Sequence, residues 1–161
     1  MRRDNLNNFM VCFLAFGTPF GLAAGLCTGN LITGFLTGII AGGLFAGGML
    51  IFLIGLDKKM EPVREQLMKE HEILFEGGAN HFYKNEGVGG WLFLLEDRLH
   101  FISHNVNLNV HTLTVSYADI VSIKKAATVN TIQITLKNGD EERFVVNRRK
   151  KWIQLIEEHI K

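Results

Sequence analysis

A long uncharged stretch near the start of the chain limits what this sequence can fold into. No Asp, Glu, Lys or Arg occurs between Asn5 and Leu56, a run of 52 residues. Apolar residues dominate from Phe9 onward, and one helical crossing of a bilayer needs about 20 of them. The run is long enough for two crossings, so we expect an integral membrane protein rather than a purely soluble one.

The polar group at 28–30 divides the run in two. We therefore place one membrane-spanning helix near 9–26 and a second near 31–56, which together form a membrane anchor over residues 1–57. An uncharged turn joins the two helices.

Basic residues flank the anchor on one side. Arg2 and Arg3 precede the first predicted span, and Lys58 and Lys59 follow the second, whereas the turn at 27–30 carries no basic residue. Because basic flanks stay on the cytoplasmic side, we expect a multi-pass protein of the cell membrane with both termini in the cytoplasm.

A cleaved secretory signal is the alternative interpretation. Met1-Arg2-Arg3 would be its positive start, and the small residues at 23–25 would be its cleavage site. The second span would then remain, and the C-terminal region would still lie in the cytoplasm.

Glycine recurs every fourth residue in both predicted spans, which places a groove along one face of each helix. Small residues at this spacing let helix backbones approach closely in lipid. The expected helix-packing positions are Gly17, Gly21, Gly25, Gly29, Gly34, Gly38 and Gly42. The grooves either face each other within a hairpin or form a homo-oligomeric interface. The run holds no ionisable residue of the kind that a channel or carrier uses, so the hairpin is interpreted as an anchor.

The second half of the chain is charged, with 13 basic and 14 acidic residues from Glu61 to Lys161. Pro62 suits the first turn of a helical connector over 58–71. A domain over 72–161 then shows strand patterns, the clearest being the alternation from Thr131 to Lys137. Seven short strands are predicted, at 73–75, 91–95, 99–102, 113–117, 120–123, 132–136 and 144–146.

Turn and helix signals complete the domain. Asn138-Gly139 predicts a hairpin with a type I′ turn. Helical spacing of apolar residues from Trp152 to Ile160 predicts a C-terminal amphipathic helix, with Asn147 as its N-cap. The fold class is therefore α+β: a transmembrane helical hairpin, then a seven-stranded β-barrel or sandwich that the last helix caps.

The domain resembles a GRAM domain, a member of the pleckstrin-homology-like superfamily, over roughly residues 70–160. The resemblance is carried by the run from Gly90 to His104, by Val115 to Ile120, by Phe144, and by Trp152-Ile153. It implies a seven-stranded barrel with a C-terminal helix, and lipid or protein binding rather than catalysis.

Candidates for chemistry are weak. His100 and His104 would lie about 13 Å apart on a strand, too far to share a metal ion. The glycines at 87–90 lack the third glycine of a dinucleotide-binding loop, because Leu92 stands there, and are interpreted as a turn between the first two strands. We expect no enzyme activity, no metal and no cofactor.

The basic run Arg148, Arg149, Lys150 and Lys151 is the candidate binding site. Four like charges at a helix N-terminus oppose the helix dipole. Beside a membrane they would attract anionic lipid headgroups, and the other interpretation is a solvated face. Nucleic acid is not expected, since the domain has no net basic charge.

We therefore expect an integral membrane protein whose cytoplasmic GRAM-like module binds anionic lipid or a protein partner. The alternative is a glycine-rich oligomeric structural membrane protein in which the hairpin is the functional part.

Overall fold

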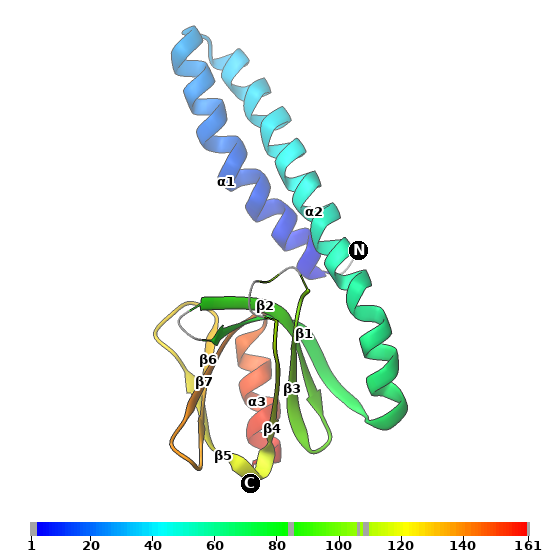
Figure 1. Ribbon diagram of the computed structural model, residues 1–161. Coiled ribbons are helices and arrows are strands. Elements are labelled where there is room, and N and C mark those ends of the chain that lie inside the picture. The colour runs from blue at the N-terminus through cyan, green and yellow to red at the C-terminus, as the bar shows by residue number, and fades with distance from the viewer. Residues whose placement is uncertain (1–2, 84–85, 106, 108–109, 161) are drawn as a thin grey trace. The chain divides into compact units, whose positions relative to one another are not determined.

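The computed structural model describes residues 3–83, 86–105, 107 and 110–160, with side chains from residue 6 onward. The chain divides into two compact units, Met1–Glu61 and Pro62–Lys161. The first unit is a pair of helices, and the second is a curled sheet with one covering helix (Figure 1).

The helix pair consists of α1 (Arg3–Thr28) and the first part of α2 (Leu31–Glu70). Gly29 ends α1 with a φ of +62°, the left-handed conformation that glycine adopts without strain. Asn30 then caps α2, because its Oδ1 accepts hydrogen bonds from the backbone N–H groups of Ile32 (2.9 Å) and Thr33 (3.3 Å). The polar break in the apolar run is therefore a tight helix–turn–helix connection.

The two helices are longer than the sequence suggested. α1 begins at Arg3 rather than near residue 9, and α2 continues without a break to Glu70. The separate connector helix expected over 58–71 is thus the end of α2. Pro62 lies inside this helix, although its ring nitrogen cannot donate to the carbonyl of Lys58.

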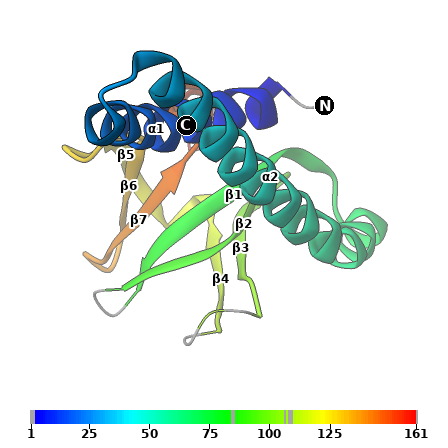
Figure 2. The same ribbon diagram turned by 90° about the horizontal axis from the view of Figure 1, so that it is seen from above.

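The second unit contains one antiparallel sheet of seven strands in the order β4-β3-β2-β1-β7-β6-β5. Seen from above, β1–β4 and β5–β7 form the two halves of a curled half-barrel (Figure 2). Its strands are β1 (Ile73–Tyr83), β2 (Glu86–Leu95), β3 (Arg98–Ser103), β4 (Thr112–Ser116), β5 (Ile120–Lys125), β6 (Thr131–Leu136) and β7 (Glu141–Val146). A 3-10 turn, η1 (Tyr117–Asp119), joins β4 to β5, and α3 (Arg149–His159) ends the domain.

The two halves meet where β1 pairs with β7. Ala79 lies opposite Val146, and His81 lies opposite Phe144. The core fills the curl of the sheet, and its largest buried side chains include those of Trp152, Phe101 and Phe144.

α3 closes the core from the side of β5 and β6. Trp152 is 1% exposed, and its ring meets Phe75 of β1 edge-on at 4.8 Å between centroids. Gly77 lies beside this indole, and a Cβ there would be in ordinary contact with it, 3.8 Å from Trp152 Cζ2. At the opposite end of the helix, the Tyr117 hydroxyl donates a hydrogen bond of 2.6 Å to the carbonyl of Leu95.

Two local details differ from the sequence expectation. The β6–β7 hairpin exists, but of its central residues only Gly139 has a positive φ, at +88°. The loop has three residues and is therefore not the two-residue type I′ turn that the sequence predicted. The Leu136 carbonyl accepts a hydrogen bond from the Gly139 N–H, and the Leu136 N–H donates one to the Asp140 carbonyl. The cap of α3 is Arg148 rather than Asn147, and it makes no side-chain capping bond.

The glycines at 87–90 lie within β2 rather than in a turn. Gly87 pairs with Phe82 and Gly90 pairs with Ala79. A Cβ on Gly90 would lie 2.4 Å from the backbone oxygen of Ile102 and 2.5 Å from the ring of Phe101. Glycine at 90 thus lets β2 and β3 close on each other.

Candidate functional site

The basic run identified in the sequence lies where β7 turns into α3. Arg148 adopts the left-handed conformation, with a φ of 56°, and α3 begins at the next residue. The side chains of Arg148, Lys150 and Lys151 are exposed, whereas Arg149 is half-buried. The structure therefore brings the four cations together on one short surface segment.

The electrostatics of this segment are unfavourable within the domain. The first turn of α3 holds no acidic residue, so no carboxylate within that turn offsets the cations at the positive end of the helix dipole. Each such contact costs about 0.3–1 kcal/mol at a surface. Within the part of the chain that the structure describes, no carboxylate pairs with Arg149, Lys150 or Lys151.

The loop between β5 and β6 lies against the basic run. Arg149 Nη1 donates a hydrogen bond of 3.4 Å to the Thr128 carbonyl, and Val146 N–H donates one of 2.9 Å to the Asn130 carbonyl. Figure 1 shows this loop standing out from the sheet. Val129, in the turn that precedes β6, is 80% exposed. Sequence reasoning did not connect this loop to the basic run, because the contact joins residues 21 positions apart.

The glycines of the helix pair lie mostly at the contact between α1 and α2. A Cβ on Gly17 would lie 2.6 Å from the Gly38 oxygen, and one on Gly34 would lie 2.6 Å from the Gly21 oxygen. Gly25 and Gly42 also face the opposite helix, which leaves Gly29 as the exception.

Gly29 has no neighbour within 4 Å of an added Cβ, because it forms the turn rather than the contact. The other glycine positions face the partner helix of the same hairpin. Phe16 and Phe45 stack beside them at 4.3 Å between centroids.

A chain of hydrogen bonds inside the half-barrel was not identified from the sequence. His81 of β1 is 1% exposed; its Nε2 lies 2.6 Å from Glu142 Oε2, and its Nδ1 lies 2.8 Å from His111 Nε2. The Ser103 hydroxyl accepts a bond of 2.8 Å from the His111 backbone N–H. These side chains link β1 and β7 to the segment before β4, and no sequence spacing indicated the link.

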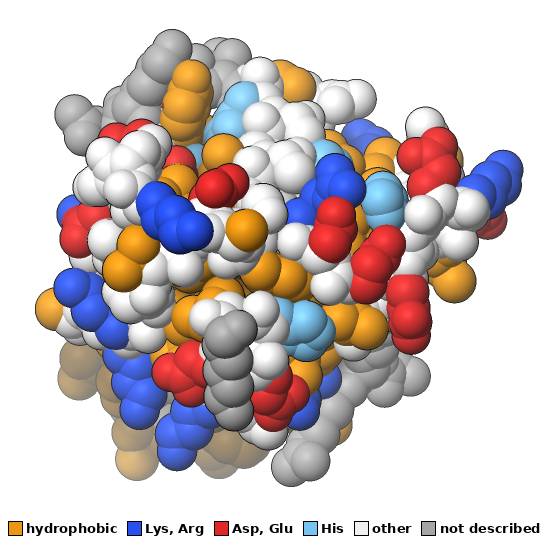
Figure 3. Space-filling view, turned by 90° about the horizontal axis from the view of Figure 1, so that it is seen from below, with side chains coloured by type: hydrophobic (Ala, Val, Ile, Leu, Met, Phe, Trp, Pro, Cys, Tyr) orange, Lys and Arg blue, Asp and Glu red, His pale blue; other side chains and the backbone are white. Residues whose placement is uncertain are grey.

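Another polar cluster lies at the β2–β3 turn. His71 Nδ1 lies 2.9 Å from Glu96 Oε1, and Arg98 contacts both carboxylate oxygens of Asp97 at 2.6 and 2.8 Å. The hydrogen bond with His71 lowers the pKa of Glu96, and the one with Arg98 lowers the pKa of Asp97. Acidic, basic and histidine side chains lie next to one another on this face (Figure 3).

The spacing of His71, Glu96 and Asp97 would permit a metal ion. However, Arg98 and the Glu72 N–H already occupy oxygens of both carboxylates. We therefore assign no metal site to this cluster.

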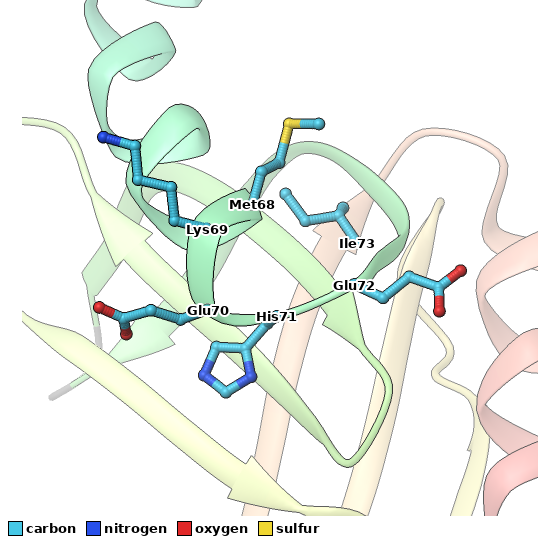
Figure 4. A pocket seen from close by; sticks show the side chains of 6 residues that line it. All are labelled: Met68, Lys69, Glu70, His71, Glu72 and Ile73. Atoms are coloured by element: carbon cyan, nitrogen blue, oxygen red, sulfur yellow. The ribbon is translucent and has the colours of Figure 1, made fainter.

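A hollow of about 500 Å³ lies where α2 passes into β1 and is lined by residues 68–73. The side chains of these consecutive residues point in different directions, with His71 and Glu72 directed apart (Figure 4). They do not converge on one ligand position.

The last turns of α2 are attached to the sheet by a buried ion pair. Arg64 Nε donates a hydrogen bond of 2.8 Å to Glu76 Oε2 of β1, and the guanidinium lies 5.5 Å from the centre of the Trp91 ring. Trp91 Nε1 donates to the same Glu76 oxygen at 3.1 Å.

The predicted fold class is confirmed: two long helices are followed by a seven-stranded antiparallel half-barrel that a C-terminal helix closes. The resemblance to a GRAM domain stays a prediction.

Solved structures with a similar fold have low sequence identity to this chain. The C-terminal domain of an unknown protein from Leishmania infantum is 18% identical, with a TM-score of 0.51, and the match covers 67% of this chain and 97% of that one. The Slm1-PH domain in complex with inositol-4-phosphate is 10% identical, with a TM-score of 0.45, over 55% and 96%. The Vps36 N-terminal PH domain is 10% identical, with a TM-score of 0.46, over 57% and 80%. No protein-family model and no curated protein matches the sequence.

Proposed function

We propose that this chain is a membrane-anchored, GRAM-like binding module that contacts anionic lipid through the basic run at 148–151. In this proposal the helix pair spans the bilayer, both termini lie in the cytoplasm, and the chain is not an enzyme. The observation that carries the proposal is the group of four adjacent cations at the N-terminus of α3.

The helix pair has the length and surface expected of a membrane anchor. Both helices are long and apolar enough to cross a bilayer, and only 11% of the most apolar part of each is buried. A core helix of a soluble protein would be mostly buried. Here large apolar side chains such as Leu26 and Leu31 are more than 80% exposed, which favours a lipid environment.

The basic run favours contact with an anion outside the chain. The cations repel one another and the helix dipole, so local stability alone does not explain them. An anionic membrane surface attracts each cation near it by about 1 kcal/mol. A helix fixed to the core by Trp152 and Ile156 holds the run in one place.

The glycine contacts bear on the alternative function. Six of the seven expected packing glycines face the other helix of the same hairpin. The grooves are thus engaged within one chain, which favours the anchor over the oligomeric structural protein.

Flotation of the fragment 61–161 with vesicles tests the proposal. Circular dichroism should first show a folded, β-rich fragment. It should then float with phosphatidylcholine vesicles that contain phosphatidylglycerol more than with phosphatidylcholine alone, and added salt should weaken binding. Replacing all four cations of the run with Gln should weaken binding by up to about a thousandfold, since about 1 kcal/mol is lost per charge.

The control is the double replacement of Lys69 and Lys137 with Gln, two exposed cations outside the run. It should lower binding far less. Equal losses in the two variants, or no preference for anionic vesicles, would contradict the proposal and favour an acidic protein partner.

A further inference from the structure

The exposed surface around the β5–β6 loop combines cations with an apolar tip. Lys124 and Lys125 are exposed at the end of β5, and within the described residues neither pairs with a carboxylate. Val129 follows in the turn before β6, 80% exposed, and Arg149 of the basic run contacts the loop at the Thr128 carbonyl.

The loop holds its apolar tip in a fixed position. The Thr128 carbonyl accepts bonds from Thr131 N–H (3.3 Å) and from Arg149, and the Asn130 carbonyl accepts from Val146 N–H (2.9 Å). The Thr131 hydroxyl donates to the Val129 carbonyl at 3.3 Å. The three backbone carbonyls of residues 128–130 therefore accept hydrogen bonds within the protein, and Val129 is the exposed apolar side chain between two exposed polar ones.

Several kinds of anionic partner would bind the cations, but few would also bury the apolar side chain of Val129. A soluble phosphate or an isolated headgroup would leave the isopropyl group in water. A bilayer offers anionic headgroups at its surface and apolar chains just beneath, which suits an apolar tip between two groups of cations. Because the carbonyls of residues 128–130 already accept hydrogen bonds within the protein, their entry into the headgroup region requires little desolvation.

From this arrangement we infer that the β5–β6 loop is a membrane-insertion element: Val129 enters the interface of an anionic bilayer, and Lys124 and Lys125 bind headgroups beside it. The inference rests on the proposed lipid contact of the basic run and extends that surface across the loop. The binding partner of this surface is the anionic bilayer itself.

Fluorescence quenching in the full chain tests the inference. The protein with Val129→Trp is reconstituted into phosphatidylcholine vesicles with or without phosphatidylglycerol, and a nitroxide-labelled lipid quenches indoles that enter the interface. The control is Val121→Trp. Val121 is an exposed valine at the start of β5, the strand that leads into the loop, and it lies away from the loop itself. Both variants share the background of Trp91 and Trp152.

Val129→Trp should be quenched more than Val121→Trp, and more strongly with phosphatidylglycerol present. Adding Lys124→Gln and Lys125→Gln should lower the ratio of inserted to free loop about thirtyfold, the effect of about 1 kcal/mol for each cation. Adding Lys137→Gln instead, in the β6–β7 turn, should leave the quenching unchanged.

Equal quenching at positions 129 and 121, or quenching that ignores both phosphatidylglycerol and the two lysines, would overturn the inference. The fragment flotation assay separates this failure from failure of the proposed function. If binding of the fragment depends on the basic run while Val129→Trp is not quenched, the lipid contact stands and the insertion is wrong.

Discussion

Breaking the buried ion pair between Arg64 and Glu76 should detach the end of α2 from the sheet. Arg64→Met removes the guanidinium and keeps an apolar stem over Trp91. Removal of one partner from a buried pair costs about 3–5 kcal/mol, because the other charge stays buried without compensation. Here the Glu76 side chain is 21% exposed and keeps its bond from Trp91 Nε1. We therefore expect a smaller loss, about 2 kcal/mol in the free energy of unfolding.

The assay is urea unfolding of the fragment 61–161, followed by tryptophan fluorescence, with hydrogen exchange of the amides at 63–70. Arg64→Met should speed exchange in this segment and lower the unfolding midpoint. In a double-mutant cycle with Glu76→Gln, the coupling energy should be about 1–2 kcal/mol.

A matched control is Arg143→Met, which breaks an ion pair with Glu141 in which both side chains are exposed (3.4 Å). Its unfolding midpoint should hardly change, because exposed pairs contribute little. Equal effects of Arg64→Met and Arg143→Met, or strict additivity in the cycle, would refute the view that the buried pair holds the helix end.

Two further predictions concern the helix pair and the response to pH. Leucine at Gly21 or Gly38 should lower the melting temperature of the full chain in detergent, since a Cβ alone would lie 2.8 Å from a backbone oxygen of the other helix. Gly55→Leu is the control and should leave the melting temperature unchanged, because an added Cβ there has no neighbour within 4 Å. Equal losses at all three positions would contradict the close packing of the two helices. Burial lowers the pKa of His100 below its ordinary value of 6.5, so the unfolded chain binds this proton more tightly and the free energy of unfolding should fall as the pH drops below about 6.5. His100→Gln should flatten that part of the profile in denaturant titrations at several pH values, and an unchanged slope would show that His100 is not its cause.

Local patterns in the sequence predicted the secondary structure of the domain well. The alternation from Thr131 to Lys137 corresponds to β6, and the apolar spacing around Trp152 corresponds to α3. These signals are strong because one buried face repeats every two residues in a strand and every three to four in a helix. The glycines at 87–90 were misplaced because a turn and a closely packed strand both favour glycine. Only the pairing with β1 and β3 shows which of the two applies.

Contacts between distant residues could not be predicted from such patterns. His81 and Glu142 are 61 positions apart, and Arg64 and Glu76 are 12 apart on different kinds of element. Each pair depends on strand register and on where a helix ends. A polar residue that is buried and bonded looks the same in the sequence as one that is solvated.

The β5–β6 loop and the start of α3 also depart from local conformational preference. Among the described residues other than glycine, Asn130 and Arg148 have a positive φ. Asparagine tolerates this conformation, whereas for arginine it is unusual and costs about 1 kcal/mol or more. The left-handed Arg148 lets α3 begin directly after β7, which brings Arg149 to the Thr128 carbonyl and leaves Lys150 and Lys151 exposed. The strained backbone and the mutually repelling cations thus lie on the same surface. A conflict of this kind between local conformational preference and the observed structure is expected where a surface is shaped for binding a partner rather than for stability of the fold.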